Sequence, residues 1–145
     1  MTGVRAYAAD SLIDATPDEV WPVLIDAAAW PDWDSGVSSV VGQVALGKKL
    51  TISVTVNPGR AFPVTVKELV APRRMVFRGG MPLGLFVGER TYTLVAEGAG
   101  TRLTMREEYS GLLAAMITKS IPDLGPSFST FVEGIKEPVA RRRSQ

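Results

Sequence analysis

The chain has 145 residues, a single-domain length, and 46% of them are hydrophobic, so a compact core can form. Lys and Arg number 16 against 15 Asp and Glu, and the resulting net charge of +1 argues against nucleic-acid binding. Because cysteine and histidine are both absent, disulfides, thiolate nucleophiles, histidine bases and the common transition-metal sites are excluded. We therefore expect no metal and no cofactor.

The apolar residues are too scattered for a membrane protein. No run approaches the roughly 20 residues needed to span a bilayer, and residues 1–12 lack the pattern of a secretory signal. Arg141, Arg142 and Arg143 near the C-terminus are typical of a solvated tail. We expect residues 1–145 to form one cytoplasmic domain, a monomer or homodimer, that neither spans a membrane nor binds nucleic acid.

The N-terminal part predicts one strand followed by two short helices. Residues 4–14 are the expected strand, and a capping box follows it, because Thr16 and Glu19 can each accept a bond from the other's backbone N–H. An apolar stripe at helical spacing comes next, formed by Val20, Trp21, Leu24 and Ile25. A second helical piece over residues 26–30 should end at Pro31.

The middle of the chain predicts a series of strands. Residues 50–56 alternate between apolar and polar, as in a strand with one buried and one wet face. Further strands are expected at residues 37–41, 62–70, 75–77, 86–95 and 101–109. Turn signals at residues 57–60, 71–74 and 98–100 favour an antiparallel meander over βαβ units.

The last third of the chain is predicted to be helical. Residues 112–120 carry apolar side chains at helical spacing, and residues 121–125 interrupt them. Pro126 can open a final helix, and Pro138 should kink or stop it. The apolar stripe of this helix contains Phe128, Phe131, Val132 and Ile135. These elements make an α+β domain whose sheet must bend over its one long helix.

This order of elements, together with several motifs, resembles the START-like helix-grip superfamily and in particular its polyketide cyclase/dehydrase-like branch. The motifs are the segment Ile13 to Trp21, the Trp-Pro-Asp-Trp that closes residues 26–33, Gly100 to Thr104, Tyr109 to Gly111, and the paired phenylalanines of the last helix. The resemblance spans nearly the whole chain. It implies a curved antiparallel sheet of six to seven strands around a long C-terminal helix, with a hydrophobic cavity between them. Members bind lipids, sterols, polyketides or hormones, and some are enzymes, so no single activity is implied.

The strongest polar candidates for a binding site lie on the last predicted hairpin. Arg90 and Tyr92 share one face of its first strand, and Met105, Glu107 and Tyr109 share one face of its second. A turn centred on the glycines between these strands places Arg90 near Glu107 or Tyr109. Because an unpaired buried charge is costly, we expect Arg90 and Glu107 to pair.

Other elements should complete the wall of a mostly apolar cavity of roughly 300–1,000 Å³, the usual range for ligand sites. The further ligand-binding candidates are Ile52, Val54, Met116, Phe128 and Phe131. Met81, Leu85 and Ile117 could close the cavity from the same side as Met116. Trp30 and Trp33 are more typical of packing than of a pocket wall.

Three functions fit these features. The first is a carrier or sensor of a hydrophobic small molecule (lipid-, polyketide- or aromatic-like), held by apolar burial worth about 25 cal/mol per Å². The second is a polyketide cyclase or dehydratase that uses Glu107 and tyrosines as acid and base. It ranks second because a partner such as Arg90 makes a carboxylate a poorer base. The third is a protein-interaction module that uses the glycine-rich, apolar residues 79–86.

Overall fold

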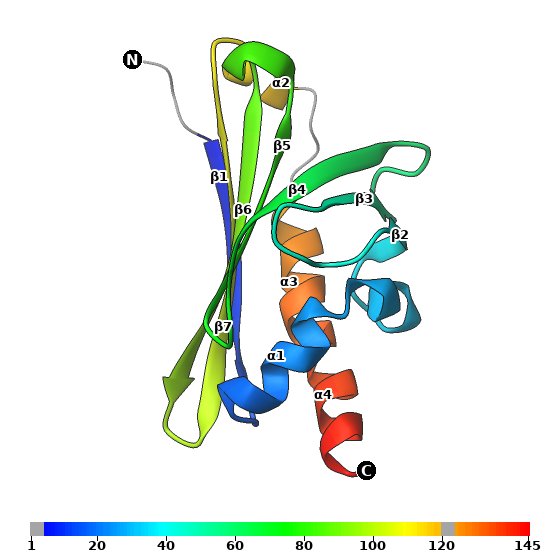
Figure 1. The fold of residues 1–145 in the computed structure, drawn as a ribbon, viewed down its shortest axis with the longest axis vertical. Coiled ribbons are helices and arrows are strands. Elements are labelled where there is room, and N and C mark those ends of the chain that lie inside the picture. The colour runs from blue at the N-terminus through cyan, green and yellow to red at the C-terminus, as the bar shows by residue number, and fades with distance from the viewer. Residues whose placement is uncertain (1–4, 120–123) are drawn as a thin grey trace.

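The computed structural model describes residues 5–119 and 124–145, which form a seven-stranded antiparallel sheet with helices packed against one face (Figure 1). The strands are β1 (Arg5–Ile13), β2 (Val37–Val41), β3 (Lys49–Val54), β4 (Ala61–Val70), β5 (Arg74–Gly80), β6 (Val87–Glu97) and β7 (Gly100–Ser110). Their order in the sheet is β1-β7-β6-β5-β4-β3-β2. The predicted meander is therefore present, and β1 pairs with its last strand.

The helices are α1 (Pro17–Ile25), η1 (Ala27–Asp32), η2 (Pro82–Gly84), α2 (Ala114–Thr118), α3 (Gly125–Gly134) and α4 (Lys136–Arg143). The predicted capping box is present at the start of α1, where each of Thr16 and Glu19 accepts a bond from the other's backbone N–H. The expectation that the second helical piece ends at Pro31 is wrong. The N–H of Trp33 reaches the carbonyl of Trp30 at 3.4 Å and closes one more turn.

The sheet bends sharply between its two halves. In Figure 1, the antiparallel strands β1, β7, β6 and β5 lie along nearly the same axis, while β4 crosses toward β3 and β2 on the side of α3. The β4–β5 register shifts between Val66 and Glu68, and the β2–β3 register shifts between Val37 and Ser39. Such bulges bend a strand and increase its twist. The two shifts let the sheet curl around α3.

The C-terminal helix is kinked and continues. Helices α3 and α4 meet at Ile135, because Pro138 has no N–H to bond the carbonyl of Gly134. The three C-terminal arginines are exposed, as predicted, but Arg143 is not free, since it pairs with Glu19 at 2.8 Å and donates to the carbonyl of Asp14 at 2.7 Å. Residues 4 and 120–123, which include parts of the predicted first strand, of the helix over 112–120 and of the break after it, lie outside the described residues.

The core lies between the sheet and the helices α1, η1 and α3. Trp30 is fully buried, and its indole N–H donates to the carbonyl of Leu24 at 3.1 Å. Its ring meets Phe131 edge-on at 5.0 Å between centroids and Tyr92 at 6.0 Å. The half-buried Trp33 also contacts Phe131, at 5.1 Å between centroids. Both tryptophans therefore pack the core around α3.

At Gly134, α3 closely approaches the backbone of the segment that precedes β2. A methyl group at this position would overlap the carbonyl oxygen of Asp34. Alanine is intrinsically the better helix residue by about 1 kcal/mol, yet we expect Gly134→Ala to lower the free energy of unfolding by about 1–3 kcal/mol. Urea denaturation measures it, with the exposed Ser129→Ala on the same helix as the control. A Gly134→Ala protein as stable as the wild type would contradict the close approach.

Candidate functional site

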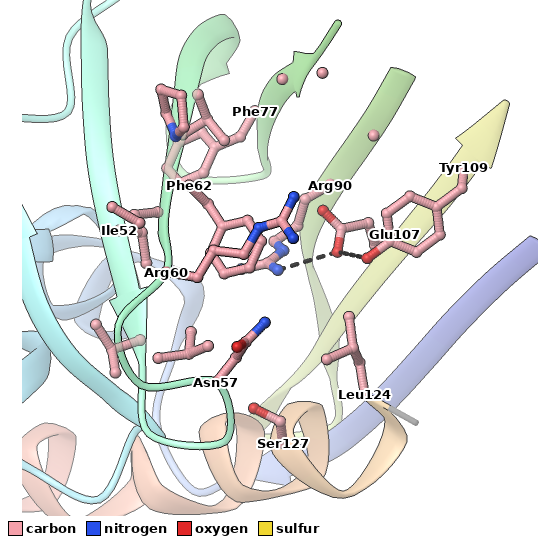
Figure 2. A pocket seen from close by; sticks show the side chains of 18 of the residues that line it. Ile52, Asn57, Arg60, Phe62, Phe77, Arg90, Glu107, Tyr109, Leu124 and Ser127 are labelled. Carbon is pink, nitrogen blue, oxygen red and sulfur yellow. Dashed lines mark hydrogen bonds and ion pairs between the residues drawn. The ribbon is translucent and has the colours of Figure 1, made fainter. Parts of the chain in front are cut away.

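A cavity of about 280 Å³ lies between the concave face of the sheet and α3 (Figure 2). Strands β2 to β7 and helix α3 contribute to its wall. The volume is slightly below the expected range, because the rings of Phe77, Phe128 and Phe131 occupy the inner end. The exposed wall residues gather at 60–63 and 80–81, so the mouth lies between the β3–β4 connection and the end of β5.

A charged cluster stands on the β6–β7 wall of this cavity (Figure 2). The Nη2 of Arg90 pairs with Oε2 of Glu107 at 3.1 Å, and the hydroxyl of Tyr109 donates to the same oxygen at 2.7 Å. The guanidinium also lies over the ring of Phe128, 5.0 Å from its centroid. Among the described residues, no hydrogen bond ends on Oε1 of Glu107. This oxygen is therefore available to a bound molecule.

The β6–β7 hairpin fixes the positions of the cluster. Its turn contains Gly98 at φ +61°, a conformation that glycine adopts easily. The turn sets Leu94 opposite Leu103 and Arg90 opposite Glu107. The prediction left open whether Arg90 faces Glu107 or Tyr109, and the register assigns it to Glu107.

The ring of Tyr109 is held on three sides. Phe86 stacks on it at 5.5 Å between centroids, and Tyr7 meets it edge-on at 6.2 Å. Its cross-strand partner is Gly88, where a Cβ would come within 3.3 Å of the ring. The absence of a side chain at Gly88 therefore leaves room for Tyr109 to reach Glu107.

Burial and charge act together on the titratable groups of the site. Burial is the largest single effect and lowers the pKa of the Arg90 guanidinium, but Glu107 and Tyr92 together outweigh it and raise this pKa above its ordinary value. Burial raises the pKa of Tyr109, and the negative charge of Glu107 raises it further. Burial likewise raises the pKa of Tyr92, against the opposing charge of Arg90. Near neutral pH, the cluster thus contains a charged guanidinium and protonated phenols.

The structure places most of the predicted site residues on the cavity wall. They are Ile52, Val54, Arg90, Met105, Glu107, Tyr109, Phe128 and Phe131. Tyr92 does not line it, because its side chain is fully buried in the core between the rings of Phe77 and Phe131. Among the described residues, neither its hydroxyl nor Nε of Arg90 has a hydrogen-bond partner.

The predicted closure of one side is only partly present. Helix α2 directs Ile117 into the cavity and leaves Met116 62% exposed, so Met116 is not part of the wall. Met81 lines the cavity and Leu85 does not. The apolar 79–86 segment therefore contributes to the wall, chiefly through its glycines, Met81 and Phe86.

Several wall residues were missed by the sequence analysis. Asn57 and Arg60 come from the β3–β4 connection, Phe62 from β4 and Ser127 from the first turn of α3. Residues 57–60 were recognised as a turn, but a turn signal does not tell toward which face of the sheet the turn folds. Ser127 directly precedes Phe128, the first residue of the apolar stripe of its helix. This neighbouring position was the one sign in the sequence that Ser127 could reach the cavity wall.

Residues 6–136 match a protein family described as polyketide cyclase / dehydrase and lipid transport. The chain belongs to this family. The resemblance drawn from the motifs is thereby confirmed. A search of curated proteins finds no match for the chain.

Solved structures confirm the helix-grip fold. Norcoclaurine synthase of Thalictrum flavum, in complex with dopamine and hydroxybenzaldehyde, is 16% identical with a TM-score of 0.72, over 99% of this chain and 91% of that one. The Zhui aromatase/cyclase of Streptomyces sp. R1128 is 15% identical with a TM-score of 0.71, over 97% and 96%. A protein of Thermus thermophilus is 20% identical with a TM-score of 0.70, over 95% and 99%. At these identities the likeness establishes the fold and no activity.

Two further features concern the described residues alone. Within residues 5–119 and 124–145, no helix has the length and apolar character to cross a membrane. In the same ranges, no three acidic side chains come together in a way that could hold a metal ion.

The Arg90–Glu107 pair can be tested by a double-mutant cycle. Removing one partner leaves the other charge desolvated, so Arg90→Met and Glu107→Gln should each lower the free energy of unfolding by about 3–5 kcal/mol. The double variant should recover part of that loss, because no orphan charge remains. Urea denaturation of the four proteins measures the coupling, and strictly additive losses would contradict the pairing.

Because the pKa of Tyr109 is raised, we expect the stability of the protein to depend on pH near and above the ordinary tyrosine pKa of about 10. In the unfolded chain the phenol loses its proton first, so stability that is present below about pH 10 is lost as the pH rises. The free energy of unfolding of the wild type should therefore fall more steeply between about pH 9 and pH 11 than that of Tyr109→Phe. Urea denaturation across this range decides it, and parallel curves would contradict the assignment.

Proposed function

We propose that this protein binds one small, largely apolar molecule in the cavity and acts as a carrier or sensor. The observation that carries the proposal is an apolar cavity whose wall contains a preassembled charged cluster with one carboxylate oxygen left free. A ligand's O–H or N–H can donate to Oε1 of Glu107 while its body covers apolar wall. Because Arg90 and Tyr109 already fix the carboxylate, binding costs little ordering of side chains.

The size of the cavity limits the ligand. An engineered apolar cavity of about 150 Å³ takes up benzene. This cavity, of about 280 Å³, is nearly twice as large and opens at one end. A body of about two fused rings fits inside it, with any further group at the mouth. The family description includes lipid transport, and one structure of the same fold holds two small molecules, which supports a binding role.

An enzyme of the cyclase or dehydratase type is the second candidate. Glu107 and Tyr109, joined at 2.7 Å on the cavity wall, could serve as base and acid. A proton taken up by Glu107 would, however, leave the guanidinium of Arg90 without a counter-charge in a buried site. The carrier function therefore ranks first. An enzyme would return a chemically altered ligand, which mass analysis of the released molecule detects.

A protein-interaction module is supported less well. Leu83 is 95% exposed at the tip of η2, as a partner surface would require. Yet Met81 and Phe86 of the same segment line the cavity, and Phe86 stacks on Tyr109. The segment is thus accounted for as part of the pocket wall.

Filling the cavity should weaken binding strongly without unfolding the protein. Val54 is half-buried on the cavity wall, so Val54→Phe places a ring in the free space, whereas Val95→Phe adds the same ring at an exposed position outside it. We expect the neutral fluorescent probe N-phenyl-1-naphthylamine to bind the wild type and Val95→Phe alike, and Val54→Phe at least about tenfold more weakly. Fluorescence titration measures it, and native mass spectrometry of the purified protein looks for a retained ligand. Equal binding to all three proteins would show that the probe does not occupy the cavity.

A further inference from the structure

We propose that the natural ligand is an organic anion, with its apolar body in the cavity and its acidic group at the mouth against Arg60, Asn57 and Ser127. The proposal rests on the proposed function and adds the chemical class of the ligand. It follows from an imbalance of charge around the cavity and from three polar side chains on its wall that have no hydrogen-bond partner among the described residues.

The charged residues of the wall do not cancel. They are Arg60, Arg90 and Glu107. Arg90 and Glu107 neutralise each other in the ion pair at 3.1 Å. Arg60 has no ion pair within the described part of the chain, and its guanidinium lies 5.7 Å from the centroid of the Phe62 ring. The cavity therefore presents one uncompensated positive charge, and that charge is at the exposed end.

The backbone brings Arg60 to the mouth. Gly59, at φ +84°, lets the β3–β4 connection reverse, and the N–H of Arg60 reaches the carbonyl of Asn57 at 3.4 Å. The side chain of Arg60 then extends along Phe62 at the rim. Figure 2 shows Arg60 and Asn57, from this connection, and Ser127, from α3, among the side chains that line the cavity.

Arg60, Asn57 and Ser127 offer hydrogen-bond donors, and none of them is acidic. Among the described residues, no hydrogen bond is made by the guanidinium of Arg60, the side-chain amide of Asn57 or the hydroxyl of Ser127. The first turn of α3, which contains Ser127, has no acidic residue. A guanidinium matches the paired oxygens of a carboxylate or sulfonate, and the amide and hydroxyl can each donate one more bond.

The interior of the cavity explains why the acid belongs at the mouth. The free Oε1 of Glu107 is an acceptor and would repel an anion placed beside it. Most of the remaining inner wall is apolar, including the rings of Phe77, Phe128 and Phe131, and it cannot solvate a charge. An amphipathic acid of about two rings satisfies both ends, because its neutral part can reach Glu107 while its anionic group stays near Arg60 and water.

A matched pair of probes tests the proposal. The anion 1-anilinonaphthalene-8-sulfonate and the neutral N-phenyl-1-naphthylamine share one aromatic body and differ in the sulfonate. Fluorescence titrations use the wild type, Arg60→Gln, and the control Arg78→Gln, which removes the same charge from an exposed position of β5 outside the cavity. We expect Arg60→Gln to weaken binding of the sulfonate about five- to tenfold and binding of the neutral probe less than about twofold. Arg78→Gln should change neither, and salt should weaken only the sulfonate.

The two proposals fail in different ways. If Arg60→Gln weakens both probes equally, or neither, the anionic ligand is overturned while the pocket stands. If Arg78→Gln weakens the sulfonate as much as Arg60→Gln does, the effect belongs to net charge, and the site at the mouth is overturned. If the neutral probe does not bind saturably, or if Val54→Phe does not weaken its binding, the binding function itself fails, and the anionic ligand fails with it.

Discussion

A sheet of seven strands has to bury its concave face under a single helical layer. The site depends on the difference between the volume that the sheet encloses and the smaller volume that α3 fills. Bulges in β4 and β2 curl the sheet until it surrounds α3 on several sides, yet one helix cannot fill the enclosed volume. The rings of Trp30, Phe77 and Phe131 close the inner half. The outer half remains as the cavity. Beyond Ile135, α4 packs beside α1, where Arg143 pairs with Glu19.

The charges around the cavity divide its length into two environments. Deep in the pocket, Arg90 and Glu107 are paired and bonded to Tyr109, so their net charge is zero and their geometry is fixed. A buried pair of this kind adds little stability compared with apolar residues of the same volume, and orientation of a ligand is a reason to retain it. At the mouth, Arg60 has no ion pair among the described residues and is partly wet. An amphipathic ligand of the kind we propose would find a hydrogen-bond acceptor at one end and a positive charge at the other.

The sequence predicted the parts of the site that follow from strand pairing. Alternation along β6 and β7, with glycines between them, places Arg90 and Glu107 on one inward face, and only the exact register needed the structure. The alternation predicted which side chains point inward, but not how deep in the core each of them lies. Tyr92 points inward but is covered by the packing of Trp30, Phe77 and Phe131, and that packing depends on how far η1 enters the core. The position of Arg60 depends on the path of a turn, which composition does not encode.

The choice between a carrier and an enzyme depends on the shared oxygen of the cluster. Oε2 of Glu107 accepts from both Arg90 and Tyr109, so the two donors stabilise the carboxylate where it already is. The raised pKa of Tyr109 also keeps its proton in place. A catalytic acid has to lose a proton, and burial together with the charge of Glu107 opposes this loss at Tyr109. A catalytic base has to gain a proton, and at Glu107 this gain would leave the buried charge of Arg90 without its partner. An arrangement that holds its protons in place is suited to orienting a bound molecule and returning it unchanged.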